Sequence, residues 1–352
     1  MADVADDALV ALADSGPEYD PFDSGFLLAN HGPMVVDALL AMGLDDEVIP
    51  WVERYMPRLS GQPVRRERIT GDWKQALGDL SRFRDWVDVF DDQMSDAPWE
   101  DVLNRWIPRL APGTSGGVHG AIRTAHAVRM LDRGESAPRI CELAQGLGYW
   151  AASYRTLPKS SAPSAGLLPS EALRHLEQLD EEDRKGWIRF TDPIGKLTSL
   201  PSFGDAADLV DTEQDPSYLL SDLTRAFAAI LVTNVETVNP RALCHGLTAG
   251  GATRLMLDHL SPEATASSLL YNWQLAAAFY CALVLDAPAQ KVDLPEESAD
   301  ELISEALQCP DEHGIKVTEA CLREYQLDPD PMFLVSARET TRRLNVVGLN
   351  LY

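Results

Sequence analysis

Residues 116–131, GGVHGAIRTAHAVRML, are the stretch from which the fold of this sequence is most directly inferred. Two glycines open it, and the residues that follow include no proline and favour a helix. His119 and His126 lie seven positions apart, which is two helical turns, so a helix places both imidazoles on one face. Arg123 lies between them and Arg129 follows. This stripe indicates either a functional site or hydrogen-bonded histidines of the core.

Helical patterns continue through the rest of the chain. Apolar residues recur at helical spacing between proline and glycine boundaries, and almost no segment alternates as a strand does. We therefore predict an all-α protein. The expected helices cover about residues 33–42, 73–94, 99–110, 116–131, 138–157, 171–179, 219–237, 241–260, 264–285, 299–307, 312–325 and 330–343.

The domain organisation follows from the distribution of proline. We expect one large helical domain over residues 25–345, preceded by an N-terminal arm at 1–24 that contains one short helix. Residues 158–218 carry six prolines and several serines and glycines, which predicts an irregular insertion. Long irregular segments inside a compact chain commonly serve as lids or binding loops.

The composition excludes several classes of protein. A net charge of −25 argues against binding to nucleic acid or to an anionic membrane surface. Five cysteines without a CxxC pair favour a reducing compartment. The acidic N-terminus lacks the basic region of a signal peptide, and the longest apolar run, residues 273–285, is too short to span a bilayer. We therefore expect a cytoplasmic protein that binds neither nucleic acid nor a membrane; its oligomeric state stays open.

The histidines are the strongest candidates for chemistry. His175 and His259 fit solvated or helix-terminal roles. Five others lie in or near helical segments, and imidazoles from separate helices suit iron, copper or zinc. They are His31, His119, His126, His245 and His313.

Two details of spacing constrain a metal site. Residues seven apart on a helix are separated by roughly 10.5 Å, so His119 and His126 are too far apart to ligate one ion without strain. His313 and Lys316 are three apart and reach neighbouring positions on one face. A lysine becomes a ligand when it is deprotonated or converted to a carbamate.

Other catalytic motifs are weak or missing. The sequence has no GxSxG and no HExxH, and its glycine-containing segments follow no predicted strand, so neither a nucleotide loop nor a bound cofactor is expected from them. Cys244 beside His245 suggests a thiol nucleophile, but sequence neighbours do not face each other on a helix. Tyr149, Trp150, Tyr271 and Trp273 are candidates for the aromatic walls of a binding site or for ordinary core packing.

Four blocks of the sequence, taken in order, resemble the questin oxidase-like family. They are NHGPMVVDALLAMG (30–43), GGVHGAIRTAHAVRML (116–131), ALCHGLTAGGATRLML (242–257) and DEHGIKVTEACLREY (311–325). The resemblance covers roughly residues 25–340. Members include fungal enzymes that oxidatively open anthraquinone rings in polyketide pathways. The resemblance implies a mostly helical fold and a mononuclear non-haem iron held by several histidines and an N-carboxylated lysine.

Carried onto this chain, the resemblance implies His31, His126, His245 and His313 as iron ligands, with Lys316 as the lysine that becomes carboxylated. The second block departs from the family's H-x-x-x-H pattern, because position 122 is isoleucine. His126 fits the second histidine of that pattern, and His119 precedes it by two turns. Which of the two ligates the metal is therefore left open. The other histidine and Arg123 are the expected catalytic residues, and Arg123 would hold a phenolate or carboxylate of the substrate.

The function implied is an oxygenase that uses O2 at iron(II) to oxidise or cleave a ring of a polycyclic aromatic polyketide such as an anthraquinone. Two alternatives remain. One is a metal-free oxidase of the same substrates that is assisted by NADPH. NADPH is also a candidate external reductant for the iron enzyme. The absence of a dinucleotide fingerprint disfavours tight binding of NADPH. The other is a non-catalytic helical binding protein.

Overall fold

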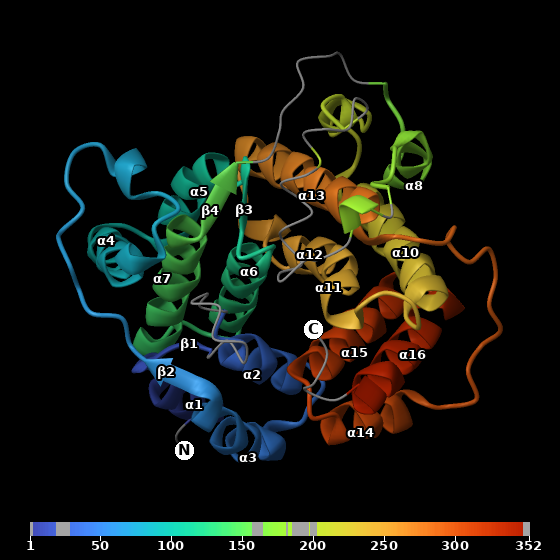
Figure 1. Cartoon of the computed structure of the whole chain (residues 1–352). Coiled ribbons are helices and arrows are strands. Elements are labelled where there is room, and N and C mark those ends of the chain that lie inside the picture. Colours follow the sequence, from blue (N-terminus) through green and yellow to red (C-terminus); the bar gives the residue numbers. More distant parts are fainter. Residues whose placement is uncertain are drawn as a thin grey trace. The chain divides into compact units, whose positions relative to one another are not determined.

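A computed structural model describes residues 3–18, 29–156, 165–180, 182–184, 197 and 203–347. The predicted all-α class is confirmed, because helices dominate the described residues and the strands form two small antiparallel pairs (Figure 1). No helix in the described part of the chain is both long and apolar enough to cross a membrane.

The chain divides into two compact units. Unit 1 comprises residues 1–156 and 255–264, and unit 2 comprises residues 157–254 and 265–352. The division is finer than the single large domain over residues 25–345 that the sequence predicts. Each unit is described by itself.

Unit 1 is built around the helix α7 (Ala137–Ala152), against which α1, α4 and α6 pack. Ser136 caps this helix and Pro138 lies in its first turn. The other elements are α1 (Val4–Ala13), β1 (Ser15–Glu18), α2 (Gly32–Ala41), α3 (Asp45–Tyr55), η1 (Met56–Arg58), β2 (Leu59–Gly61), η2 (Trp73–Ala76), η3 (Leu80–Arg82), α4 (Phe83–Asp96), α5 (Trp99–Leu110), β3 (Gly113–Ser115), α6 (His119–Asp132), β4 (Tyr154–Thr156) and η8 (Leu257–His259). β1 pairs with β2, and β3 with β4.

Small residues bring α6 and α7 close together. A Cβ added to Gly120 would lie 2.6 Å from the Cα of Trp150, and one added to Gly146 would lie 3.0 Å from the Cα of Thr124. Glycine is therefore needed on both sides of this contact. The stretch singled out in the sequence thus forms a helix whose first turn is fixed against the centre of unit 1.

The prediction of one helix over residues 73–94 is wrong. The structure has the short 3-10 helices η2 and η3, and only then α4. Gly78 breaks the helix with a φ of +75°, and its backbone N–H donates to the carbonyl of Ala151, 3.0 Å away. A tertiary hydrogen bond and a left-handed glycine outweigh the local helical pattern here.

The N-terminal segment contains the one short helix that the sequence predicts. In α1, Asp3 caps the first turn, and Ala5, Ala8, Leu9 and Leu12 are buried. The described part of the expected arm therefore packs against the rest of unit 1. Residues 19–28 lie outside the described residues.

Unit 2 is centred on α15 (Glu312–Leu327), which contacts α10, α12, α14 and α16 (Figure 1). Polar caps start several of its helices: Asp215 for α10, Ser298 with Glu301 for α14, and Asp311 for α15. The other elements are α8 (Pro169–Ala172), η4 (Leu173–His175), η5 (Glu182–Arg184), η7 (Ala206–Asp208), α10 (Pro216–Asn234), α11 (Pro240–Leu243), α12 (His245–Arg254), α14 (Ala299–Gln308) and α16 (Pro331–Val347). Helix α13 (Pro262–Leu283) belongs to unit 2 from Thr265 on.

The predicted helix over residues 241–260 is interrupted. It forms α11, α12 and η8, and Cys244 separates the first two. His245 consequently begins a helix of its own. The predicted irregular insertion contains, in its described part, short helical turns and a parallel bridge between Leu167 and Val210.

Candidate metal centre

His31 and His119 form a buried pair in unit 1. His31 is the N-cap of α2 and His119 is the first residue of α6, so helix packing between α2 and α6 brings them together. Their ring centroids are 4.7 Å apart and the rings are nearly perpendicular. The exposed fraction is 3% for His31 and 6% for His119. Both imidazoles are therefore held in place within the protein.

Each ring of this pair is anchored through Nδ1. For His31, Nδ1 lies 3.0 Å from a carboxylate oxygen of Glu18, which also forms an ion pair with Arg58. For His119, Nδ1 lies 2.6 Å from the carbonyl oxygen of Gly116. Carbonyl and ionised carboxylate oxygens only accept hydrogen bonds, so Nδ1 must carry the proton in both rings. Nε2 is then the nitrogen that bears a lone pair in the neutral imidazole.

His126 has a different environment, two turns further along α6. Its Nδ1 lies 2.7 Å from Oδ2 of Asp37, which also accepts from Nε of Arg129 at 2.7 Å. Burial alone would raise the pKa of Asp37, but Arg129 and His126 outweigh it and hold the pKa below its ordinary value. Asp37 therefore stays ionised and fixes His126 through Nδ1.

Unit 2 contains a second buried histidine pair. His245 is the first residue of α12 and His313 is the second residue of α15. Their ring centroids are 5.2 Å apart with an interplanar angle of 72°. The Nδ1 of His313 lies 2.7 Å from Oδ1 of Asp311, and the Nδ1 of His245 lies 3.3 Å from the carbonyl oxygen of Ala242. The pair repeats the pattern of unit 1: one ring is held by a carboxylate and the other by a carbonyl three residues earlier.

Asp311 connects His313 to a buried arginine. Arg241 forms an ion pair with the other oxygen of Asp311. Burial alone would raise the pKa of Asp311, but His313 and Arg241 reverse the effect and hold the pKa well below its usual range. The carboxylate is thus ionised, and the proton remains on Nδ1 of His313.

Lys316 lies one turn after His313 and is 4% exposed, so the predicted pair is buried on one helix. Cys244 lies close to the same residues. Its sulfur, one ring nitrogen of His245 and one ring nitrogen of His313 lie within 4.8 Å of one another. Burial raises the pKa of the Cys244 thiol to about 12. A thiol that is protonated at neutral pH does not fit the alternative of a thiolate nucleophile.

Arg123 forms a buried ion pair. It donates from Nη2 to Oε2 of Glu142 at 2.8 Å and to Oε1 of Gln145 at 3.2 Å, while Nε donates to the other oxygen of Glu142. It also lines a small cavity of about 10 Å³, large enough for roughly one water molecule, together with Asn30 and Tyr149. The guanidinium charge is therefore largely offset by Glu142.

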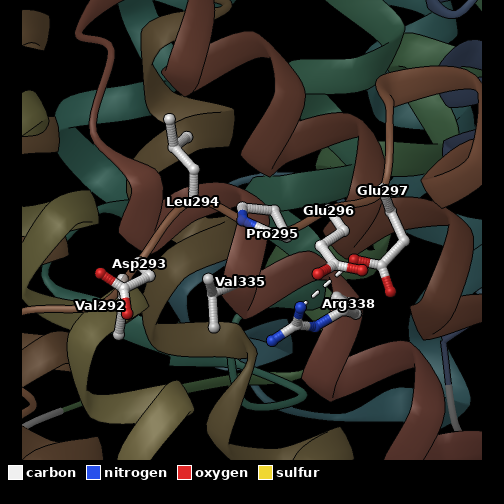
Figure 2. Close-up of a pocket in the computed structure, with 8 residues that line it drawn as sticks. All are labelled: Val292, Asp293, Leu294, Pro295, Glu296, Glu297, Val335 and Arg338. Atoms are coloured by element: carbon white, nitrogen blue, oxygen red, sulfur yellow. Dashed lines mark hydrogen bonds and ion pairs between the residues drawn. The ribbon is translucent and has the colours of Figure 1, made fainter.

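The remaining candidates occupy other environments. His259 bonds to Asp132 through Nε2 at 2.6 Å and is partly exposed, in agreement with a structural role. The aromatic candidates Tyr149, Trp150, Tyr271 and Trp273 are all buried in the core. An open groove of about 430 Å³ in unit 2 is lined by residues 292–297, Val335 and Arg338, with an ion pair between Arg338 and Glu297 (Figure 2). None of the predicted site residues line this groove.

A sequence signal common to the two pairs is the dipeptide His-Gly. It occurs at His31, His119, His245 and His313, whereas alanine follows His126. At each of the four, the histidine lies at the start of a helix.

The glycines of these dipeptides are needed for packing. An added Cβ would lie 2.8 Å from Leu12 at Gly32, 2.2 Å from Ser115 at Gly120, 2.0 Å from Phe227 at Gly246 and 3.0 Å from Cys309 at Gly314. The first turn of each helix therefore packs closely against its neighbour, which fixes the position of the preceding histidine. The four histidines form one structural set to which His126 does not belong.

The fold and these residues define the class of the protein: it is mostly helical and contains buried histidine pairs. The questin oxidase-like family model matches residues 28–321, which is most of the chain and includes all the histidines of the two pairs and Lys316. The chain belongs to the questin oxidase-like family, as the sequence blocks indicate. Membership implies an oxidoreductase with a small-molecule substrate. No curated protein matches the chain.

Proposed function

We propose that this protein is an iron-dependent oxygenase that oxidises or cleaves a ring of a polycyclic aromatic polyketide such as an anthraquinone. The family supports an oxidase of polyketide anthraquinones. The requirement for iron and the ring-opening reaction are the proposal.

The observation that carries the proposal is the state of the paired imidazoles. His31, His119, His245 and His313 are buried, and each has its Nδ1 proton held by an oxygen acceptor. Metal-ligating histidines usually donate their second ring N–H in this way, which fixes the tautomer and the orientation of the ring. The donor set suits iron(II), which proteins bind through imidazole and carboxylate groups.

The candidate ligands are His31 and His119 in unit 1 and His245, His313 and Lys316 in unit 2, and they follow the set that the family resemblance implies. Compared with the set that the resemblance implies, His119 takes the place of His126, because His119 pairs with His31 and shares the His-Gly environment. Burial disfavours charged amines in general, and a neutral amine reacts with carbon dioxide to give a carbamate. Lys316 as a carbamate would add a carboxylate-type oxygen donor.

When bound, iron would supply the one-electron and O2 chemistry that amino-acid side chains do not provide by themselves. The protein's own groups would orient the ligands and exclude water. Glu18 and Asp311 hold the rings of His31 and His313, and the close helix starts keep those rings fixed. In this proposal Arg123 contributes to the protein by holding Glu142 in place, because its positive charge already forms an ion pair with that carboxylate.

The metal content of protein purified without chelators tests the proposal. We expect about one iron per chain in the wild type by mass spectrometry of the ashed sample, and a loss of most of it in His313→Ala and Lys316→Ala. His259→Ala is the matched control, because this histidine also contacts a carboxylate but lies outside both pairs. It should keep its iron.

Two other outcomes would contradict the proposal. Wild type that binds no stoichiometric iron, even after anaerobic loading with iron(II), would leave the NADPH-assisted oxidase or the binding protein. Iron retained by Lys316→Ala would remove the carbamate from the ligand set. Labelling with ¹³C-bicarbonate, followed by NMR, detects the carbamate independently of activity.

A further inference from the structure

The carboxylates behind the paired histidines form a repeated chain of contacts. In unit 2, Arg241 contacts Asp311, and Asp311 contacts Nδ1 of His313. In unit 1, Arg58 contacts Glu18, and Glu18 contacts Nδ1 of His31. Both carboxylates are nearly completely buried, with exposed fractions of 1% and 4%. Two unrelated stretches of sequence thus build the same arginine–carboxylate–histidine arrangement.

We propose that Asp311 and Glu18 are positioning residues, which orient His313 in unit 2 and His31 in unit 1 as metal ligands, and that Arg241 and Arg58 hold the two carboxylates in place. This inference rests on the proposed function. The carboxylate would make its imidazole a stronger electron donor than the carbonyl-bonded rings of His245 and His119. Within each unit, the histidine pair would then contain one stronger and one weaker nitrogen donor.

The geometry supports a role beyond folding. The backbone N–H of His313 already satisfies one contact of Asp311, an N-cap bond of 3.0 Å to Oδ1. Capping helix α15 needs only a short polar side chain such as serine. The second contact to Nδ1, and the ion pair with Arg241 from α11, are not needed for the cap. Because the same two contacts occur at both pairs, they support a role in orienting the ring.

Asp311 variants separate the hydrogen bond from the charge. Asp311→Asn keeps an oxygen acceptor for the cap and for Nδ1 but removes the charge, whereas Asp311→Ser keeps only the cap. The matched control is Glu324→Gln. Glu324 is a buried carboxylate of the same unit and lies 3.0 Å from Arg254. Among the contacts that the structure gives for Glu324, none is to a histidine of the pairs. The Glu324→Gln variant therefore also loses a buried ion pair, but one that does not involve a histidine of the pairs.

The measurement is the dissociation constant for cobalt(II), a spectroscopic probe, obtained by competition with a chelator on the full chain. We expect Asp311→Asn to weaken binding about 10- to 100-fold, and Asp311→Ser at least as much, with a changed cobalt absorption spectrum. Glu324→Gln should stay within about twofold of the wild type. Glu18→Gln should behave like Asp311→Asn. Wild-type affinity and an unchanged spectrum in Asp311→Asn would overturn the proposal.

A metal-free readout separates this inference from the proposed function. NMR of ¹⁵N-labelled histidine in the metal-free protein should give the Nδ1-protonated tautomer for His313 in the wild type and a mixture in Asp311→Ser. If the wild type binds no metal, the proposed function fails, and the tautomer still tests the positioning role. If the wild type binds metal and His313 has the same tautomer in Asp311→Ser, only the positioning inference fails.

Discussion

The two histidines of α6 differ in what surrounds them. His119 begins the helix and pairs with His31, while His126 lies two turns later against Asp37 and Arg129. The sequence places both on one face of the helix and leaves open which of them is the proposed ligand. Their contacts distinguish them, because His119 belongs to the set of His-Gly histidines and His126 belongs to a buried charged cluster.

Alanine variants at these two positions give a direct prediction. His119→Ala should lose most of the iron, because it removes a proposed ligand. His126→Ala should keep it, because Asp37 and Arg129 remain paired with each other. Iron per chain and the melting temperature are measured on both. The reverse result, with iron lost in His126→Ala alone, would restore the ligand set that the resemblance implies.

Four of the candidate histidines lie at the starts of helices. The sequence predicts most of the helices because apolar spacing and proline or glycine boundaries are local signals. It also predicts the five histidines and Lys316 as candidates. It does not predict the break at Gly78 or the partners Glu18 and Asp37, because these depend on tertiary contacts between distant segments. The His-Gly dipeptide is a local signal that distinguishes four of the histidines before any contact is known.

Helix α12 offers a test of the close packing at these starts. Gly246→Ala places a methyl group about where Phe227 of α10 lies, so we expect a loss of about 1–3 kcal/mol of stability from overpacking. Denaturant unfolding measures it. Gly204→Ala is the control, because nothing lies within 4 Å of an added Cβ there. Adding Phe227→Leu should recover part of the loss. Equal stability of Gly246→Ala and the wild type would show that this contact is not tight.

Helix α4 gives a prediction about pH. Asp85 accepts from the backbone amides of Arg66 and Glu67 at 2.9 and 3.1 Å and from Arg82, and so ties residues 66–67 to the helix. Burial alone would raise the pKa of Asp85, but these hydrogen bonds outweigh it and hold the pKa below its ordinary value. A lowered folded-state pKa stabilises the fold above the unfolded pKa of about 3.9, and this contribution disappears as the pH falls through the folded value.

Comparing Asp85→Asn with the wild type isolates that contribution. At neutral pH the variant should be less stable by about 2 kcal/mol, the typical value for hydrogen bonds to a charged group. The difference should shrink below about pH 4, where the Asp85 carboxyl of the unfolded chain begins to bind a proton while that of the folded chain stays ionised. Denaturant midpoints across the pH range provide the measurement. A difference that is independent of pH would mean that the charge of Asp85 does not contribute.

The net charge of −25 acts on the whole molecule. Carboxylates outnumber basic side chains 55 to 30, so long-range repulsion opposes the compact state. Raising sodium chloride from about 0.01 M to about 0.15 M shortens the Debye length from roughly 30 Å to 8 Å and should raise the melting temperature. The same series in an uncharged solute at equal osmolality is the control. A melting temperature that falls over this range would mean that the ion pairs outweigh the repulsion.

Turnover by the complete protein separates the iron-dependent from the metal-free hypothesis. With a polyketide anthraquinone as substrate, the iron-dependent hypothesis predicts that the rate of O2 uptake rises in proportion to iron occupancy, because under it every active molecule needs the metal for the one-electron chemistry. Chelation should abolish the rate and iron(II) should restore it, with or without NADPH as reductant. Product mass after reaction under ¹⁸O2 should show incorporated oxygen. A metal-free oxidase would instead keep its full rate in chelator and consume NADPH in step with O2, and in that case the histidine pairs would serve the fold and not the reaction.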